Sequence, residues 1–524
     1  MIRGLKRQMK SLFFDGEVLK LMSLTFLMKP IGLVTQVLLA KYYGAGVHYD
    51  AYVLSVFLVS FVAQLVGRVF SAVAIPHLAD LKSRLGLKEQ SAYVNALVGL
   101  GIVPVALFSL ILIFRGNWIV DLAAPNAPEE TRLLAIRMLR AMALPGILVA
   151  IIQIYKSVLD INRAFRVSAL MPFINAAVTL AVLIAVHDSL GIWALPAAFT
   201  ASFCVQAVII VGVTTRRGFV RIVLPRAHFA DLRALWQRTW MVLVDSVLLV
   251  INTFMDKVFA SSLVAGSISA IAYANTLMNL GMQLFQFSLV TVMFTRMSED
   301  IAGGNIASCN RYVDDNLRRL SRLSVPVSLA IFVASPELVQ VLFQRDAFTA
   351  DDTARTASVL AMYMLGLPAF LINLVIARVF HSLKKLRDKM WLALQYLVTN
   401  VAGNILLVGP LQVTGLAISS TLAINIHLAL SLVVLARYRT GFDIRRIWRH
   451  IGVNYGLGLA TWLIYRYCGP DNLLNHYSGS GGQLGAILLG AARGIIVIVI
   501  YAGLMTTRRR LERALRRGDP TAPR

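Results

Sequence analysis

The sequence predicts an all-α polytopic membrane protein with about fourteen transmembrane helices, in two pseudo-symmetric six-helix lobes plus two C-terminal helices. Hydrophobic residues make up 58% of the 524-residue chain and charged residues only 15%, and the mean hydropathy is +0.71. A bilayer core needs roughly 20 apolar residues per helical crossing, and stretches of this length follow one another along the chain. Nearly every second connection between them is rich in Lys and Arg, which is typical of cytoplasmic loops.

The apolar stretches give the expected positions of the membrane helices. An even number of crossings, with a basic N-terminal segment and a basic tail, places both ends of the chain in the cytoplasm. Residues 1–20 lack the short apolar core and cleavage site of a secretory signal. The predicted spans are 21–43, 51–76, 93–115, 137–158, 167–187, 192–214, 239–262, 268–295, 321–343, 356–381, 390–410, 414–436, 451–468 and 484–506.

The longest predicted cytoplasmic connection divides the first six spans from the next six. The two halves begin alike, with Gly46 before Ala51-Tyr52 and Gly266 before Ala272-Tyr273. Because six is even, both halves enter the membrane from the same side, so the repeats would be parallel. The predicted parts are an N-terminal lobe 1–214, a cytoplasmic linker 215–238, a C-terminal lobe 239–437, spans thirteen and fourteen within 438–506, and a basic cytoplasmic tail 507–524.

The net charge of +25 reflects topology and does not indicate nucleic-acid binding. The basic residues lie in short clusters beside apolar segments, and no folded basic domain carries them. Cys204, Cys309 and Cys468 are scattered and form no disulfide or metal-ligand spacing. We therefore predict no nucleic-acid partner, no metal and no cofactor.

Ionisable residues inside the spans are the first candidates for function, because each costs at least about 2.5–3.5 kcal/mol to insert. Lys29 lies in the middle of the first span, before Pro30 and Gly32, which can kink the helix and open its backbone to a cavity. The alternative is a lysine whose side chain snorkels to the interface. Arg68, low in the second span, would either face a cavity or reach cytoplasmic headgroups.

The seventh span carries a polar stripe. Asp245, Asn252 and Asp256 are separated by seven and four residues, so they share one helix face. Such a stripe fits a cavity wall or a site for a coupling ion. The alternative is a structural pair between Asp256 and a neighbouring cation such as Lys257.

The eighth span carries a second polar stripe. Asn279, Gln283 and Gln286 follow Asn275 by 4, 8 and 11 residues, which is one helical face, and Thr276 lies beside it. Polar stripes in membrane helices either join helices or line water. Four amides on one helix face favour a face that lines water. The predicted substrate-binding residues are Lys29, Arg68, Asp245, Asn252, Asp256, Asn275, Thr276, Asn279, Gln283 and Gln286.

Three stretches, in order along the chain, resemble the MurJ/MviN family within the larger class of multidrug, oligosaccharidyl-lipid and polysaccharide exporters. The resemblance implies a V-shaped pair of lobes around a central cavity, with a groove from spans thirteen and fourteen for a polyprenyl tail. It also implies a flippase of the bacterial inner membrane, which moves an undecaprenyl-diphosphate-linked saccharide from the cytoplasmic to the periplasmic leaflet. The stretches are GAGVHYDAY at 44–52, DKVFAS with GSIS and YA between 256 and 274, and VLFQRDAFTADD at 341–352, followed by Tyr363 and Gly366-Leu367.

The sequence departs from the family pattern at several cavity positions. Lys29 falls where the family has an arginine, so the charge is kept and the bidentate fork is lost. Family members that carry lipid II typically have further cavity arginines and an acidic residue low in helix two. The corresponding positions here read Thr35, Ala63-Gln64, Thr276 and Gly67-Arg68.

The predicted function is therefore a lipid II-like flippase acting by alternating access, with an exopolysaccharide or O-antigen repeat unit as the alternative substrate. A multidrug antiporter of the sister family would need a buried acid in the N-terminal lobe. The first two helices offer none, although Asp245 or Asp256 could serve in the other lobe. A glycosyltransferase or polymerase would need a large catalytic loop, and 470–482 is too short, so we predict no enzyme. No Gly-x-x-x-x-Gly-Lys-Ser/Thr motif exists, which leaves ions, membrane potential or a substrate gradient as the energy source. Expected partners are the lipid-linked oligosaccharide, membrane lipids and cell-wall or exopolysaccharide synthesis machinery.

Overall fold

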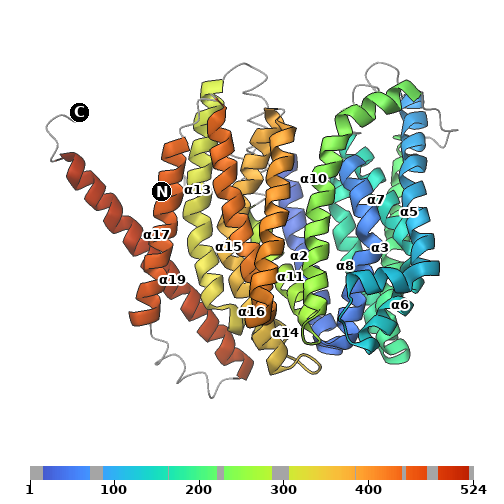
Figure 1. The fold of residues 1–524 in the computed structure, drawn as a ribbon, viewed down its shortest axis with the longest axis horizontal. Coiled ribbons are helices and arrows are strands. Elements are labelled where there is room, and N and C mark those ends of the chain that lie inside the picture. The colour runs from blue at the N-terminus through green and yellow to red at the C-terminus, as the bar shows by residue number, and fades with distance from the viewer. Residues whose placement is uncertain are drawn as a thin grey trace. The chain divides into compact units, whose positions relative to one another are not determined.

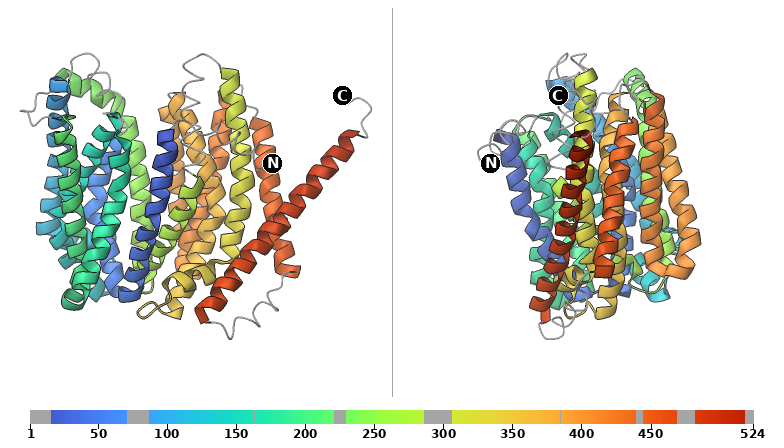
Figure 2. Two further views of the ribbon diagram at one scale, coloured as in Figure 1. Left: turned by 180° about the vertical axis from the view of Figure 1, so that it is seen from behind. Right: turned by 90° about the vertical axis from the view of Figure 1, so that its left-hand side faces the viewer.

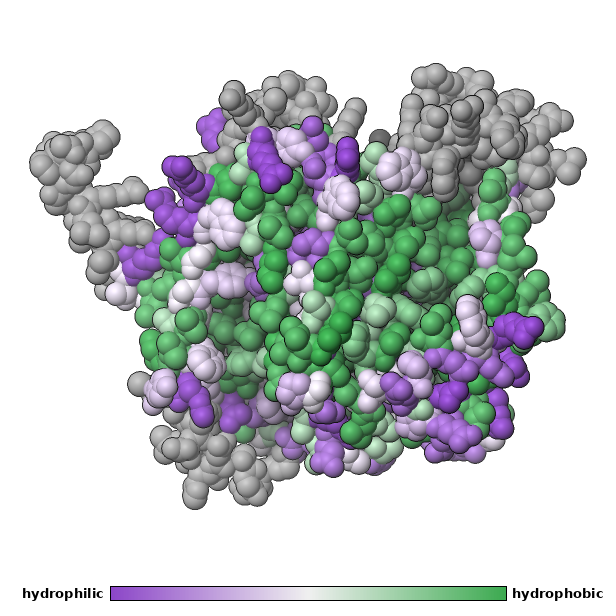
Figure 3. All heavy atoms as spheres, in the orientation of Figure 1, coloured by the Kyte–Doolittle hydropathy of each residue, from purple (hydrophilic) through white to green (hydrophobic). Residues whose placement is uncertain are grey.

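The computed structural model describes residues 16–70, 87–162, 164–220, 229–285, 306–383, 385–438, 444–468 and 482–517. Within these ranges every regular element is a helix (Figure 1), which confirms the all-α prediction. On the face drawn in Figure 3, apolar residues cover the middle of the helices and polar residues gather near their ends. This is the surface expected of helices that cross a bilayer.

The chain forms two compact units. Unit 1 comprises Met1–Ala272, Arg345–Thr349 and Leu386–Asn404. Unit 2 comprises Tyr273–Gln344, Ala350–Lys385 and Ile405–Arg524. The predicted lobes 1–214 and 239–437, and their internal symmetry, stay predictions.

Unit 1 has its core between α3 (Val47–Val69), α5 (Leu87–Ala123) and α6 (Glu129–Met142). Leu54, Leu112 and Met138 are fully buried there. α10 begins at Phe229, so part of the predicted linker 215–238 is continuous with the seventh predicted span. The unit also includes the first turns of α11 (Ser267–Phe285) and of α16 (Leu386–Arg437). Its other helices are α2 Gly16–Tyr43, α3 Val47–Val69, α5 Leu87–Ala123, α6 Glu129–Met142, α7 Pro145–Ile161, α8 Phe165–Leu190, η2 Gly191–Trp193, α9 Ala194–Arg216 and α10 Phe229–Ser261.

Unit 2 is built around α15 (Ala350–Ser382). This helix is largely buried, since 78% of its most apolar stretch lies inside the protein. Figure 2 shows α19 crossing α17 obliquely and projecting beyond it at its C-terminal end. Small residues allow α19 to approach closely: a Cβ at Gly490 would lie 3.0 Å from Glu337 Cβ, and one at Gly494 would lie 3.7 Å from Ala330 Cβ. The helices are α13 Ile306–Val333, α14 Ser335–Phe343, α15 Ala350–Ser382, α17 Ile444–Cys468, α19 Gly482–Arg517 and the remaining parts of α11 and α16.

Two spans predicted as continuous helices are bent. The span 137–158 divides into α6 and α7 with a bend of 56°, and the span 321–343 divides into α13 and α14 with a bend of 66°. Pro145 and Pro336 lie in the first turns of the second helices. Proline has no backbone N–H and interrupts the helical hydrogen bonds at these positions. Hydropathy alone did not predict the bends.

Two long helical stretches of 52 residues each, Phe165–Arg216 and Leu386–Arg437, each contain two predicted spans. A straight helix of this length would measure roughly 78 Å, against about 30 Å for the hydrocarbon core. The chain leaves the helical conformation at Gly191 (φ 52°) and at Gln412 (φ 51°). Both breaks fall between the spans that hydropathy separated.

By length and composition, six helices in the described ranges are able to cross a membrane, or up to eight if each bent pair is one span. The predicted total of about fourteen crossings stays a prediction.

The turn after α2 explains one of the family-like motifs. Gly44 has φ +61°, and a Cβ at this position would lie 2.3 Å from the carbonyl oxygen of Ala347. The N–H of Ala347 donates to the carbonyl of Lys41 at 3.1 Å. A glycine is needed here both for the left-handed conformation and for the close approach of residues 345–349.

Candidate functional site

The polar stripe on α10 faces a matching polar stripe on α16 in unit 1. In the middle of α10 and the first turn of α16, Lys389 Nζ forms an ion pair with Asp245 Oδ2 at 2.5 Å. Further along, Asn400 Nδ2 donates to Asn252 Oδ1 at 3.0 Å. Asp245, Asn252 and Asn400 are all buried, with relative exposures of 8%, 6% and 0%. We call this set of contacts between α10 and α16 the polar ladder.

The ladder ends at Asp256. Its Oδ1 accepts hydrogen bonds from Asn400 Nδ2 at 2.8 Å and from Asn404 Nδ2 at 2.9 Å. Every partner in the ladder lies 144 or 148 residues from the residue that it binds. The two offsets differ by only one helical turn, so α10 and α16 run parallel in one register. This is expected for two odd-numbered spans, which cross the membrane in the same direction.

The carboxylate of Asp256 thus accepts hydrogen bonds from two amide groups, whereas the ammonium group of Lys257 lies near an aromatic ring. Lys257 Nζ lies 5.2 Å from the centroid of the Phe57 ring, and its charge also acts on Asp50 and Asp256. In the described residues no group of three or more His, Cys, Asp and Glu is placed to hold a metal ion. The contacts join two helices, and a role of the stripe in ion coupling stays a prediction.

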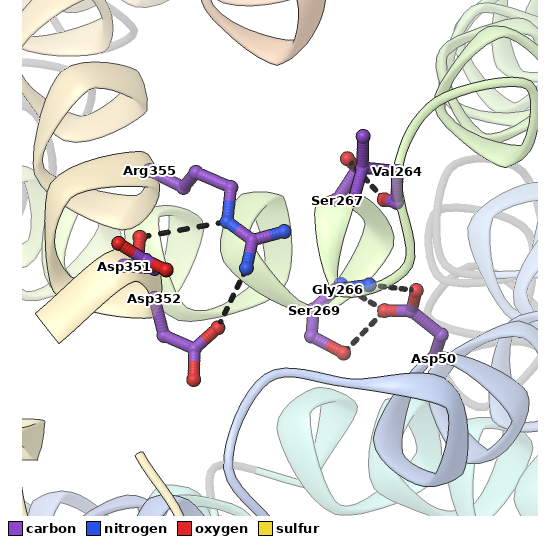
Figure 4. Close-up of polar contacts among 8 residues, drawn as sticks. All are labelled: Asp50, Val264, Gly266, Ser267, Ser269, Asp351, Asp352 and Arg355. Atoms are coloured by element: carbon purple, nitrogen blue, oxygen red, sulfur yellow. Dashed lines mark hydrogen bonds and ion pairs between the residues drawn. The ribbon is translucent and has the colours of Figure 1, made fainter. Parts of the chain in front are cut away.

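Asp50, at the start of α3, binds the N-terminus of α11 (Figure 4). Its Oδ2 accepts from the N–H of Gly266 at 2.6 Å, and its Oδ1 accepts from the N–H of Ser269 at 2.7 Å and from the Ser269 hydroxyl. The first N–H groups of a helix have no partner within the helix and carry partial positive charge, so a carboxylate there is stabilising. Gly266, just before α11, has no side chain to cap it, and Asp50 supplies the cap from a distant part of the chain.

This contact links the first two family-like motifs, because Asp50 lies in 44–52 and Gly266 and Ser269 lie in the second motif. The third motif ends at Asp352, which takes part in a separate contact in unit 2 with Arg355, three residues beyond the motif. There Arg355 Nη2 donates to Asp352 Oδ1 at 3.1 Å, and Arg355 Nε donates to the carbonyl of Asp351 at 3.4 Å (Figure 4). The motifs therefore mark helix ends held by carboxylates and backbone groups.

The remaining predicted residues are placed as follows. Arg68 is exposed in the last turn of α3. Asn275 and Asn279 are both exposed, one turn apart on α11, and Thr276 beside them is partly buried. Lys29 lies within α2, which continues through Pro30, and Gln283 lies within α11, but the side chains of both are outside the described part. Gln286 lies outside the described residues.

Sequence reasoning identified one half of the ladder and missed the other. Lys389, Tyr396, Asn400 and Asn404 are spaced by seven, four and four residues, which repeats the spacing of Asp245, Asn252 and Asp256. Tyr396 also belongs to the ladder, because its side chain forms a hydrogen bond with Asn252. Two predicted spans with polar residues at the same spacing are a signal for such pairing.

The fold is that of transporters of the MOP superfamily. A solved structure of the lipid II flippase MurJ, in an inward closed conformation, matches with a TM-score of 0.75 and 21% identity over 93% of this chain and 99% of that chain. An inward-facing multidrug resistance MATE family transporter of the same superfamily matches with a TM-score of 0.66 and 13% identity, over 80% of this chain and 96% of that chain.

The family model "Lipid II flippase MurJ" matches residues 39–468, and the chain belongs to this family. The family consists of multi-pass proteins of the bacterial inner membrane. Similar curated proteins include the probable lipid II flippase of Thermotoga maritima, 23% identical over 94% of this chain and 97% of the relative. The lipid II flippase of Burkholderia cenocepacia is 25% identical over 75% of this chain and 78% of the relative. The probable flippase of Buchnera aphidicola from Acyrthosiphon pisum is 26% identical over 76% of this chain and 78% of the relative.

The ladder predicts energetic coupling between α10 and α16. We expect Asn400→Leu to lower the free energy of unfolding, because it removes a donor from a buried carboxylate and costs about 1–3 kcal/mol. Combined with Asp256→Ala in a double-mutant cycle, the coupling should be about 0.6 kcal/mol and at most about 1.7 kcal/mol, the average and maximum for hydrogen bonds between membrane helices. Unfolding of the purified protein in mixed micelles measures both values.

Asn425→Leu is the matched control, since it removes the same amide from α16, where Asn425 donates to the carbonyl of Thr421 in its own helix and makes no other hydrogen bond among the described residues. It should show no coupling to Asp256→Ala. Equal coupling for both asparagines would rule out the ladder as a specific joint.

The cap on α11 predicts a graded response at Asp50. Asp50→Ala should destabilise the protein by about 0.5–2 kcal/mol, as loss of a helix cap does. Asp50→Asn should cost less than Asp50→Ala, because it retains one of the two acceptor oxygens, although it loses the other and the charge that interacts with the helix dipole. Thermal unfolding in detergent gives the order. Lys41→Ala, which breaks an exposed ion pair with Asp346, is the control and should leave the melting temperature unchanged.

Proposed function

We propose that this chain carries lipid II, the undecaprenyl-diphosphate-linked precursor of peptidoglycan, from the cytoplasmic to the periplasmic leaflet by alternating access. The observation that carries the proposal is the family match over residues 39–468, together with curated relatives named as lipid II flippases. The same match favours lipid II over an exopolysaccharide or O-antigen repeat unit and over a drug. Both termini would lie in the cytoplasm, and the enzymes of cell-wall synthesis are the expected partners.

A flippase makes and breaks no covalent bond, so its task is solvation. A diphosphate and several sugars must cross hydrocarbon while the lipid tail remains in it. Lys29 and Arg68 are the cations that we assign to the diphosphate. The open face of α11 with Asn275 and Asn279 supplies amide groups that can hydrogen-bond to sugar hydroxyls.

The tail needs an apolar surface that stays in contact with lipid. The two C-terminal membrane helices offer one in unit 2, where Leu459 of α17 and Leu484, Leu488 and Ile495 of α19 are 59–67% exposed. These side chains support a groove for the polyprenyl chain along spans thirteen and fourteen.

The proposal is tested by complementation in a strain depleted of its own lipid II flippase and lacking any other exporter of that kind. We expect the chain to restore growth. Failure to grow with the protein properly inserted would contradict lipid II transport and favour another lipid-linked glycan as the substrate. Loss of surface polysaccharide on deletion of the native gene would then identify that glycan.

Within the same strain, Lys29→Ala should abolish growth without loss of membrane insertion, because the variant removes the central positive charge for the diphosphate. Lys29→Arg should retain growth, since it keeps the charge and adds a bidentate donor. Lys41→Ala is the control on the same helix: Lys41 forms an exposed ion pair with Asp346 at 3.6 Å, and its loss should be tolerated. Normal growth of Lys29→Ala would exclude Lys29 from the site.

A further inference from the structure

We infer that the positively charged end of the α13–α17–α19 bundle in unit 2 is a binding site for the phosphate group of an anionic membrane phospholipid. The three helices pack against one another. The N-terminal ends of α13 and α17 and the C-terminal end of α19 lie at the same side of the unit (Figure 1). On the face drawn in Figure 3, polar residues gather over this end. The inference concerns a bound lipid that is not transported, and it depends only on the protein being in a membrane.

Charge is the first observation. Anionic lipids attract basic residues at the membrane surface, with about 1 kcal/mol for each Lys or Arg. Among the residues with described side chains, the carboxylates at this end are Asp314 and Asp315, and Asp314 forms an ion pair with Arg318. The arginines with described side chains are Arg311, Arg318, Arg319 and Arg322 on α13, Arg445, Arg446 and Arg449 on α17, and Arg508 on α19.

Two buried polar atoms are the second observation. The Tyr501 side chain is only 4% exposed, and its hydroxyl has no hydrogen-bond partner. His450 Nε2 is also buried without a partner. Buried polar atoms cost free energy unless they form hydrogen bonds. Both groups are able to donate to a phosphate oxygen.

Arg322 lies between the two atoms along α13, because Tyr501 belongs to the same core cluster as Val325 and His450 lines a depression with Ser321. Its charge acts on Tyr501 together with that of Arg508, and on His450 together with those of Arg318 and Arg449. His450 lies one residue before the predicted span 451–468, and burial, followed by these arginines, lowers the pKa of its imidazole. A bound phosphate would neutralise the repulsion that the arginines impose on His450. Tyr501, His450 and Arg322 thus define the centre of the site.

Cytoplasmic loops need basic residues near the membrane, but topology does not require them to be half-buried. Arg319 and Arg445 are exposed and fit topology alone, whereas Arg318, Arg322 and Arg508 are partly buried. A shallow depression between α13 and α17 includes Arg318 and is lined by Asp314, Ser321 and His450 together with the apolar side chains of Leu317, Ile447 and Ile451. Partial burial around buried donors indicates a site for a ligand of opposite charge.

The neighbouring surface favours a lipid over a soluble phosphate. Leu323, next to Arg322, is 53% exposed, and Trp448 of α17 is 38% exposed. Tryptophan is typical of the headgroup level of a bilayer. A phosphodiester with acyl chains would contact the arginines and these apolar side chains together.

The test measures lipid binding to the full-length protein by native mass spectrometry in detergent, with phosphatidylglycerol and phosphatidylcholine as probes. We expect the protein to retain phosphatidylglycerol in preference. Arg322→Gln should lower its occupancy about fivefold, the factor that corresponds to about 1 kcal/mol per basic residue. Tyr501→Phe should lower it as well, without any change of charge.

Arg319→Gln is the matched control, because it removes the same charge from the same helix end at an exposed position. It should bind phosphatidylglycerol like the unaltered protein. Equal losses for Arg319→Gln and Arg322→Gln, or no loss for either, would overturn the site. Unchanged melting temperatures without added lipid exclude misfolding as the cause of a loss.

Undecaprenyl diphosphate, added as a competitor, distinguishes the two lipid sources of phosphate. If it displaces phosphatidylglycerol from the unaltered protein but not from Arg322→Gln, the site belongs to the transported lipid and the phospholipid assignment is wrong. Retention of phosphatidylglycerol in its presence supports the assignment. The binding assay involves no transport, so its outcome is independent of complementation.

Discussion

The polar ladder between α10 and α16 is the constraint on which unit 1 depends. Hydrocarbon offers no hydrogen-bond partner, so each polar side chain in a membrane helix must find one within the protein. Asp245, Asn252 and Asp256 find theirs on a helix about 144 residues further along the chain. The offset fixes which turn of α16 lies against which turn of α10. It also explains why Leu386–Asn404 belongs to unit 1 while the rest of α16 belongs to unit 2.

The same rule accounts for the other long-range contacts. Asp50 satisfies the N-terminus of α11, and Glu337 of α14 forms an ion pair with Arg493 of α19. In each case a charged group that would be costly in the membrane is placed against a complementary group on another helix. Gly490 lets α19 approach α14 closely enough for the second pair. Small residues and buried charges therefore act together, the first by allowing approach and the second by fixing register.

Hydropathy predicted the parts of the fold that depend on length and composition. The spans 167–187, 192–214, 390–410 and 414–436 match α8, α9 and the two halves of α16, because a bilayer crossing sets the length of an apolar run. It did not predict the bends before Pro145 and Pro336, since a bent pair has the same composition as a straight span. The polar stripe on α10 was predicted from helical periodicity. Its partner was not, because periodicity within one helix says nothing about which helix lies opposite.

The contact between Asp50 and the start of α11 also could not be predicted from the sequence. The residue stood in a recognisable motif, and α11 began at a second one, but neither motif alone shows that the two touch. Gly266 was the missing clue: a helix that begins after a glycine has no side-chain cap of its own and needs an acceptor from elsewhere. The motifs that carried the family resemblance are thus positions where one segment completes another.

The departures from the family's cavity arginines change what recognition of a substrate can depend on. A lysine at position 29 provides a compact, strongly hydrated charge, whereas an arginine provides a planar fork that binds a phosphate through two hydrogen bonds. Under the proposed function, Lys29 would attract the diphosphate without fixing its orientation. Orientation would then come from the sugars and from the open amides of Asn275 and Asn279 on α11. Selectivity in this chain would therefore depend more on the glycan than on the diphosphate.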